Sequence, residues 1–139
     1  MAHQEKIVPF RYVGGKMRYF KAAHTEATKS TDSFRVGATL VRGGEIISSG
    51  FNQGYKTHPL QAEMYPERDY KGVHAEVNAV SRLRPYDIGS GRLYVVRICL
   101  DGTYAISRPC GPCQDFLRGK GVKKVYFIHD SDNFGELTL

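Results

Sequence analysis

The sequence predicts an α/β fold in which helices cover both faces of a mixed sheet. Two observations support this class. Segments of helix-forming residues alternate with short β-rich runs, in the order helix, hairpin, helix, strand, helix, strand. The final strand, helix and strand form a crossover unit, so the last two main strands should run parallel. Because 41% of the 139 residues are hydrophobic, we expect one domain over residues 1–139, with its core at about residues 16–130.

The first helix and the hairpin are predicted from local patterns. Residues 16–30 contain good helix formers, and their apolar side chains recur at the i, i+3, i+4 spacing of an amphipathic helix. Residues 36–52 contain two β-rich runs around Gly43 and Gly44, which can adopt the positive φ of a tight hairpin turn. The next segment, 52–71, has two prolines and no clear period, which indicates a long loop.

The second half of the chain predicts another helix and further strands. From Val73, apolar residues repeat at helical spacing as far as Arg84, which precedes a proline and is therefore disfavoured in the α conformation. Residues 92–100 and 122–130 are rich in β-branched and aromatic side chains, which indicates two strands. Residues 134–139 predict a short edge strand or a helix stub.

A helix between these two strands is predicted to begin around a pair of cysteines. Pro109 and Pro112 suit its first turn. Cys110 and Cys113 would then lie on one face at the helix N-terminus, where the helix dipole and free backbone N–H groups stabilise thiolates. In a reducing compartment such a C-x-x-C pair is typical of either a metal site or a redox couple.

His74 decides for the metal site. It lies at the start of the second predicted helix, and with Cys110 and Cys113 it supplies one nitrogen and two sulfur ligands. Three protein ligands are typical of catalytic zinc, which keeps its fourth position for water, whereas structural zinc requires a fourth protein ligand. Cys99 is placed inside a core strand and so is not expected to serve as that ligand.

Glu76 follows His74 by two residues and is the candidate catalytic group. From that position the carboxylate can lean over the open coordination position instead of binding the metal. It could then take a proton from the zinc-bound water and return it to a leaving amine. The combination of H-x-E with P-C-x-x-C is the signature of zinc-dependent nucleobase deaminases.

Charge and composition narrow the partners and the compartment. The net charge of +6 and pI near 9.3 favour anionic partners such as nucleotides or nucleic acid. Three cysteines are too few for the disulfide framework of a small secreted domain. No apolar run reaches eighteen residues and no signal sequence is evident, so we expect a cytoplasmic protein with no membrane partner.

The stretches VHAEVNAV, VGATLV, GFN and RPCGPC resemble the cytidine deaminase superfamily, and most of all its deoxycytidylate deaminase branch. The resemblance extends over roughly residues 36–128. It implies a three-layer fold with a mixed five-stranded sheet and the two metal-bearing helices on one face. It also implies zinc as the cofactor and hydrolytic conversion of cytosine to uracil, and we expect a homo-oligomer.

The same resemblance implies substrate contacts at three matching positions. Asn52, in GFN, would contact the sugar hydroxyl. The backbone N–H of Ala75 would hold the pyrimidine carbonyl oxygen. The backbone carbonyl of Arg108 would receive the exocyclic amine.

Three hypotheses about the substrate remain open. The first is a deaminase of a free cytosine nucleotide of the dCMP type, and the second is a deaminase of cytosine in single-stranded DNA or RNA. The third is a non-catalytic zinc module that binds nucleic acid, although a carboxylate at Glu76 would be superfluous there. Basic and aromatic residues of the long loop could serve either enzyme, by binding one phosphate or by stacking on a strand; they are Phe51, Tyr55, Lys56, His58, Tyr65, Arg68, Tyr70 and Lys71.

Overall fold

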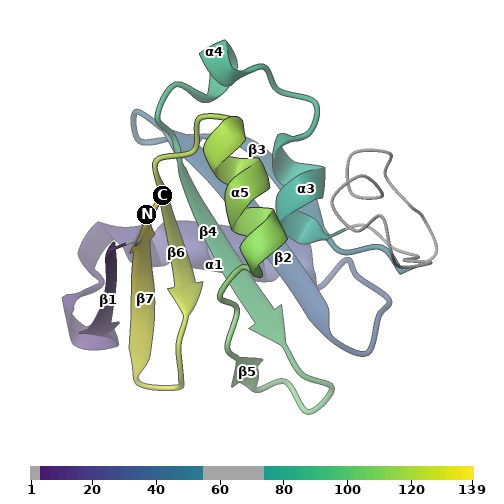
Figure 1. The fold of residues 1–139 in the computed structure, drawn as a ribbon. Coiled ribbons are helices and arrows are strands. Elements are labelled where there is room, and N and C mark those ends of the chain that lie inside the picture. Colours follow the sequence, from purple (N-terminus) through teal and green to yellow (C-terminus); the bar gives the residue numbers. More distant parts are fainter. Residues whose placement is uncertain (1–3, 55–73) are drawn as a thin grey trace.

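Seven strands form one mixed sheet in the computed structural model, which describes residues 4–54 and 74–139 (Figure 1). Their order across the sheet is β1-β7-β6-β4-β2-β3, with the short β5 paired to β4. The strands are β1 (Gln4–Pro9), β2 (Arg35–Arg42), β3 (Glu45–Phe51), β4 (Arg92–Ile98), β5 (Tyr104–Ala105), β6 (Lys124–Ile128) and β7 (Asn133–Thr138). β4 and β6 run parallel, which confirms the predicted crossover, and the other described pairs are antiparallel.

Helices cover both faces of this sheet, as predicted (Figure 1). α1 lies on one face, while α3 and α5 lie side by side on the other. The α-helices are α1 (Met17–Ala27), α3 (Ala75–Val80), α4 (Pro85–Ile88) and α5 (Gly111–Gly119), and the 3₁₀ turns are η1 (Phe10–Tyr12) and η2 (Gly14–Lys16).

Side chains alternate between the two faces of the central strands and so contribute to two separate hydrophobic cores. In β4, Tyr94 and Val96 pack with α1, whereas Leu93 and Val95 pack with the helices of the opposite face. Side chains of successive strand residues point to opposite faces, so one strand contributes to both cores. Arg97 follows Val95 by two residues and therefore belongs to the face that carries α3 and α5.

Two glycines let the helices approach the sheet closely. A Cβ at Gly37 of β2 would lie 2.0 Å from the Ala23 carbonyl oxygen in α1. A Cβ at Gly50 of β3 would lie 2.6 Å from the Ala79 nitrogen in α3. Both distances are far below van der Waals contact, so only glycine permits this packing.

The hairpin turn and the break after α3 follow the local sequence. Gly43 and Gly44 have φ values of 59° and 80°, as a tight turn requires. The helix expected over residues 73–84 is shorter, since α3 ends at Val80. Arg84 is extended with ψ of 156°, and Pro85 then occupies the first position of the separate helix α4.

The expectation of five strands was wrong, because β1 adds a strand beside β7 and the short β5 pairs with β4. β7 was expected as an edge strand or a helix stub, but it lies between β6 and β1 and pairs with both. Cys99 was expected inside a strand; it lies just after β4, where its backbone pairs with Thr103 in the turn toward β5. Pro109 was expected in the first turn of α5, but it precedes the N-cap residue Cys110.

Candidate active site

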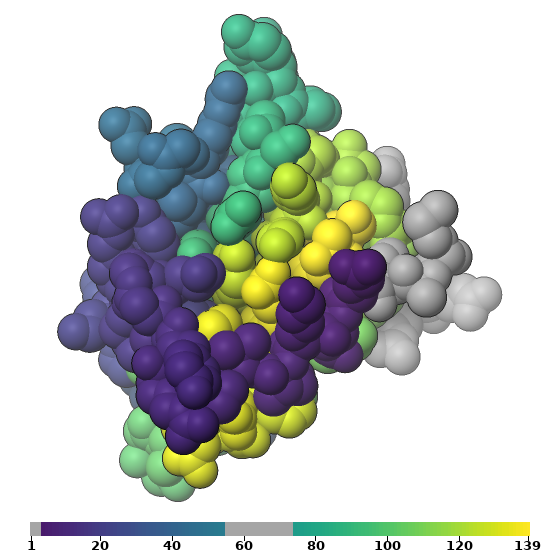
Figure 2. All heavy atoms as spheres, turned by 90° about the vertical axis from the view of Figure 1, so that its left-hand side faces the viewer, coloured from purple at the N-terminus to yellow at the C-terminus, as the bar shows by residue number. Residues whose placement is uncertain are grey.

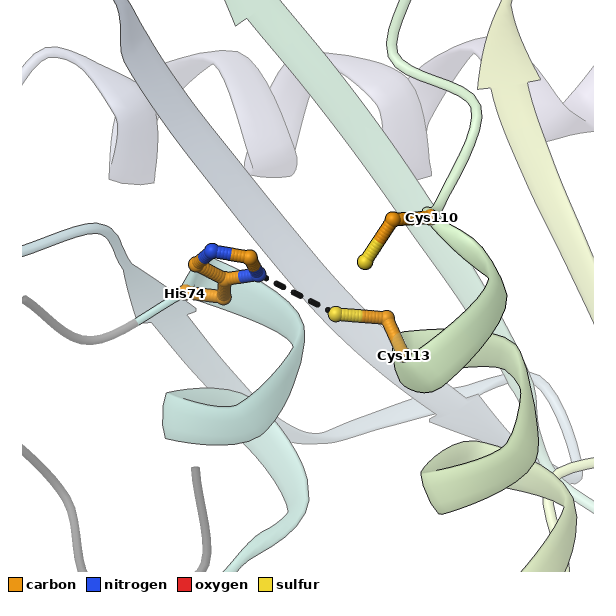
Figure 3. A group of neighbouring side chains, drawn as sticks. All are labelled: His74, Cys110 and Cys113. Atoms are coloured by element: carbon orange, nitrogen blue, oxygen red, sulfur yellow. Dashed lines mark hydrogen bonds between the residues drawn. The ribbon is translucent and has the colours of Figure 1, made fainter. Parts of the chain in front are cut away.

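Two helix N-termini bring the predicted metal ligands together (Figure 3). His74 is the N-cap of α3 and Cys110 is the N-cap of α5, and both have extended backbone angles. Cys113 lies in the first turn of α5. The ligand atoms of these three residues all lie within 4.8 Å of one another, and His74 Nδ1 is 3.1 Å from Cys113 Sγ.

The three residues of the cluster differ in their exposure to solvent. Cys113 is fully buried, His74 is half-buried and Cys110 is exposed. One side of the cluster therefore faces packed side chains of the core, and the other side is open to an approaching molecule. Cys99 is not part of the cluster.

This set of residues fits a zinc ion. Zinc binds thiolate at about 2.3 Å and imidazole nitrogen at about 2.0 Å, so tetrahedral ligand atoms lie about 3.5 Å apart. The described ligand atoms have nearly that spread, and their nitrogen and two sulfurs are donors that zinc prefers. Among the described residues no fourth histidine, cysteine or carboxylate joins the group, as a catalytic site requires.

Glu76 lies in the first turn of α3, and its side chain is only 7% exposed. Burial raises the pKa of this carboxyl group, although the positive charge of His74 opposes the change. Burial alone would lower the pKa of His74, but a hydrogen bond with Cys110 and the charge of Glu76 outweigh it and raise the pKa. The imidazole and the carboxylate are thus electrostatically coupled.

A cavity of about 330 Å³ opens beside the cluster, which is within the usual size range of small-ligand pockets. It contains His74 and Cys110 as well as Glu76, so the metal ligands and the carboxylate face one space. The three residues with an expected substrate contact, Asn52, Ala75 and Arg108, also border it. The lining residues are Phe34, Val36, Asn52, His74, Ala75, Glu76, Val95, Arg97, Ile106, Ser107, Arg108 and Cys110.

The Asn52 amide is held by the chain on both of its ends. Its Oδ1 accepts from the Val36 N–H at 2.8 Å, while its Nδ2 donates to the Phe34 carbonyl at 2.8 Å and to Asp32 at 2.9 Å. These partners fix which end of the amide is oxygen. Both amide hydrogens are used, so the remaining capacity for a ligand is one acceptor lone pair on Oδ1.

Ala75 and Arg108 border the cavity from the two helix N-termini. Ala75 is the first residue of α3, where backbone N–H groups have no partner within the helix. Arg108 lies just before the Pro-Cys pair, and its Nε donates to Glu5 of β1 at 2.6 Å. The guanidinium is therefore directed to the sheet edge, and the backbone of Arg108 is the part that resembles a substrate contact.

Sequence reasoning missed several residues of the cavity, among them Ser107, Phe34 and Arg97. The Ser107 hydroxyl donates to the Val95 carbonyl at 2.7 Å and accepts from the Ile128 N–H at 2.7 Å. These bonds fix the segment that leads to Cys110. Ser107 could have been noticed, because it lies two residues before the P-C-x-x-C motif. Nothing in the sequence marks Arg97 as a site residue, because this depends on which face of β4 carries its side chain.

Most of the predicted loop residues lie outside the described part of the chain. These are Tyr55, Lys56, His58, Tyr65, Arg68, Tyr70 and Lys71. Phe51 is described and ends β3, where its carbonyl accepts from the Asn78 side chain at 3.0 Å. That bond ties α3 to the end of β3, next to Asn52.

A second cavity, of about 510 Å³, lies where the chain begins α1, turns between β2 and β3 and leaves α4. Figure 2 shows these three segments next to one another, in purple, blue and teal. The cavity is lined by Lys16, Arg18, Arg42 and Arg92 together with glycines and tyrosines, and none of its lining residues is a histidine, cysteine or carboxylate. Of these two cavities, the first is the one that is lined by histidine, cysteine and a carboxylate.

The described helices are all too short or too polar to cross a bilayer.

A helix-covered mixed sheet with histidine and two cysteines at paired helix N-termini, and a buried carboxylate beside them, is the arrangement expected of a hydrolytic zinc site. The particular family is shown by its sequence. The chain belongs to the family described as the cytidine and deoxycytidylate deaminase zinc-binding region, whose sequence model matches residues 15–129. This membership confirms the resemblance found in the sequence.

The individual relatives share at most 27% sequence identity with this chain in the comparisons that follow. ComE operon protein 2 of Bacillus subtilis is 27% identical over 119 residues, which are 81% of this chain and 59% of that protein. The chain thus spans less than two thirds of the length of this relative. Among solved structures, the dCMP deaminase of cyanophage S-TIM5 is 23% identical, with a TM-score of 0.55 and 79% of each chain covered. The cytidine deaminase of Burkholderia pseudomallei is 21% identical, with a TM-score of 0.57, and the match covers 84% of this chain and 87% of that chain.

Proposed function

We propose that the protein hydrolyses the amino group from the cytosine base of a free nucleotide of the dCMP type, producing the uracil nucleotide and ammonia. The observation that carries this proposal is the shared cavity. Glu76 is buried there beside His74 and Cys110, and Asn52 borders the same space. A volume of about 330 Å³ suits one base and its sugar.

The comparison with solved structures supports the choice of a nucleotide. The cyanophage dCMP deaminase was also solved in complex with dCMP and dUMP, and 79% of this chain is covered by that structure. At 23% identity the likeness concerns the fold, so the substrate is proposed from the residues of this chain.

His74, Cys110 and Cys113 would hold zinc, which supplies Lewis-acid activation of a water molecule at neutral pH. Glu76 takes a proton from the attacking water as its oxygen bonds to the carbon that carries the amine. The carboxyl group passes this proton to the neighbouring ring nitrogen, and it then moves the second water proton from the new hydroxyl group to the amine, so that ammonia leaves and a carbonyl remains. Burial of Glu76 suits this double role, because it stabilises the protonated form between the two transfers.

The other residues of the cavity position the substrate. The backbone N–H of Ala75 donates to the carbonyl oxygen of the base, and the carbonyl of Arg108 accepts from the amine. Asn52 has one free acceptor site, so the sugar hydroxyl would donate to its Oδ1. The sheet residues Val36 and Val95 form the apolar floor beneath the base.

The edge strand β3 supports self-association of the chain. It lies at one end of the strand order, and Ile46 and Ile47 on it are 49% and 36% exposed. A second copy could cover these side chains. We include a homo-oligomer in the proposal, and sedimentation equilibrium of the purified protein tests it.

A substrate panel tests the activity directly. The zinc-loaded protein is incubated with dCMP, CMP, dCTP, deoxycytidine and a cytosine-containing single-stranded oligonucleotide, and ammonia and uracil are followed. Turnover of dCMP above that of the oligonucleotide supports the proposal. Turnover of the oligonucleotide alone would replace it with a polynucleotide deaminase, and no turnover of any substrate by zinc-loaded protein would leave a non-catalytic zinc module.

A further inference from the structure

Arg97 places a cation on the floor of the active-site cavity. It lies near the end of β4, on the face that carries α3 and α5, and it borders the cavity together with Val95. Its strand neighbours are Val36 of β2 on one side and Ala105 of β5 on the other. The side chain thus emerges from the middle of the sheet and not from a surface loop.

This guanidinium lies over the ring of Phe34. The Arg97 Cζ lies 4.1 Å from the centre of the Phe34 ring, in a cation–π contact. Phe34 is itself positioned by Asn52, whose amide donates to the Phe34 carbonyl. Since Asn52 also accepts from Val36, directly opposite Arg97, the guanidinium is adjacent to the residues that hold the proposed sugar contact.

The stacked guanidinium has no anionic partner in the described part of the chain. Its Nε is buried, and none of its nitrogens forms a hydrogen bond or ion pair with a described residue. An arginine remains charged at any physiological pH, and leaving a charged donor buried without an acceptor is costly. Glu76 is the one carboxylate among the described cavity residues, and no ion pair joins it to Arg97.

We propose that Arg97 binds the phosphate of the substrate and makes the enzyme select nucleoside monophosphates over nucleosides. This inference rests on the proposed function and adds the group that reads the phosphate. A planar guanidinium forms two parallel hydrogen bonds to phosphate oxygens, and the contact with Phe34 uses its face, so that the terminal N–H groups can form them. A sugar held at Asn52 would bring its phosphate to the neighbouring Arg97.

Two independent measurements test the proposal. The first is the ratio of kcat/KM for dCMP to that for deoxycytidine. The second is the ratio of Kd for deoxyuridine to that for dUMP, measured by calorimetry without turnover. In Arg97→Gln we expect both ratios to fall by about 10- to 100-fold, the range of a charge-assisted hydrogen bond, while the constants for the nucleosides stay within about threefold. Arg97→Lys should lie between the two, since it keeps the charge and loses the planar pair of donors.

Arg35→Gln is the matched control. Arg35 also has a buried Nε without a described partner, and the substitution removes the same charge from the neighbouring strand β2. It lies at the start of β2, where it is opposite Ile98, and its terminal nitrogen donates to the Cys99 carbonyl, so it does not border the cavity. Both ratios should remain at the wild-type value in this variant.

The outcomes separate this inference from the proposed function. Absence of dCMP turnover together with Arg97-dependent dUMP binding would overturn the activity and keep the phosphate contact. Unchanged dUMP affinity in Arg97→Gln, or an equal loss for nucleoside and nucleotide, would overturn the role of Arg97. A loss of affinity confined to a single-stranded oligonucleotide would also overturn it, because the phosphate would then belong to a strand. Phe34→Leu, which removes the stacking ring and keeps the arginine, should reduce both ratios in the same direction by a smaller factor.

Discussion

His74 Nδ1 lies 3.1 Å from Cys113 Sγ, although 39 residues separate them along the chain. The contact exists because α3 and α5 pack side by side on one face of the sheet and begin at the same level (Figures 1 and 3). Glu76 and Cys110 extend the same relationship, since each lies within three residues of one member of the pair. The candidate active site is thus formed where two helix N-termini converge.

Removal of one sulfur should empty the metal site. In Cys113→Ala only His74 and Cys110 remain, and we expect zinc to fall from about one per chain to a small fraction of that value. Metal analysis of the dialysed protein measures it. Cys99→Ala, which lies outside the cluster, should keep its zinc. Full occupancy in Cys113→Ala would place the metal elsewhere.

Glu76→Gln should keep the fold and the zinc while losing activity by a factor on the order of 10² to 10⁴, because the amide cannot transfer the proton. Steady-state ammonia release and metal content together measure this. The control is Glu45→Gln, which neutralises an exposed carboxylate at the start of β3. A Glu76→Gln enzyme with half of the wild-type turnover would contradict the proton-transfer role.

The metal cluster could be predicted because its signals are local. His74 and Glu76 are two residues apart and the cysteines three apart, so a short motif contains each half of the site. The structure also explains two glycines of the stretches that carry the resemblance. Gly37 and Gly50 lie where α1 and α3 pack closely on the sheet.

The parts that escaped prediction depend on long-range pairing. β1 is mostly exposed and shows no alternation, and it becomes a strand because it pairs with β7, more than 120 residues away. β7 looked like an edge because only its own six residues could be read. Arg97 lies in a β-rich run, where a single cation has no evident role in the sequence. Its proposed role follows only from the face of β4 on which it lies and from its contact with Phe34.

Asn52→Ala should affect both stability and catalysis. The change leaves the Val36 N–H and the Phe34 carbonyl without their side-chain partner, so we expect the free energy of unfolding to fall by about 1–3 kcal/mol. It also removes the acceptor proposed for the sugar, so kcat/KM for dCMP should fall as well. Urea unfolding and steady-state kinetics measure the two effects, with the neighbouring Gln53→Ala as the control. A loss of stability with unchanged kinetics would show that Asn52 only organises the strands.

The pair formed by Glu136 and Lys124 should make stability depend on acid pH. A hydrogen bond from the Lys124 ammonium at 2.5 Å lowers the pKa of Glu136, helped by the charges of Lys6 and Lys16 and opposed by partial burial. With a lowered folded-state pKa, the stabilisation is present above the unfolded value of about 4.3 and is lost as the pH falls through the folded value.

Comparison with Glu136→Gln measures this contribution. Wild type should exceed the variant by about 1 kcal/mol in unfolding free energy near pH 7, and the difference should shrink as the pH falls through the lowered pKa of Glu136. Urea unfolding at several pH values gives both numbers. A difference that grows toward acid pH would contradict the sign.

The salt dependence of binding should distinguish a free nucleotide from a strand. A mononucleotide offers one phosphate to Arg97, so few counterions are released and affinity for dUMP should change little between low and moderate salt. A single strand would engage several of the basic residues of this +6 chain together, and log affinity would then fall with log salt by about −0.7 per phosphate contacted. We expect measurable dCMP turnover and an oligonucleotide slope shallower than about −1. A slope steeper than about −2 without any dCMP turnover would overturn the free-nucleotide proposal, because no single phosphate contact releases that many ions.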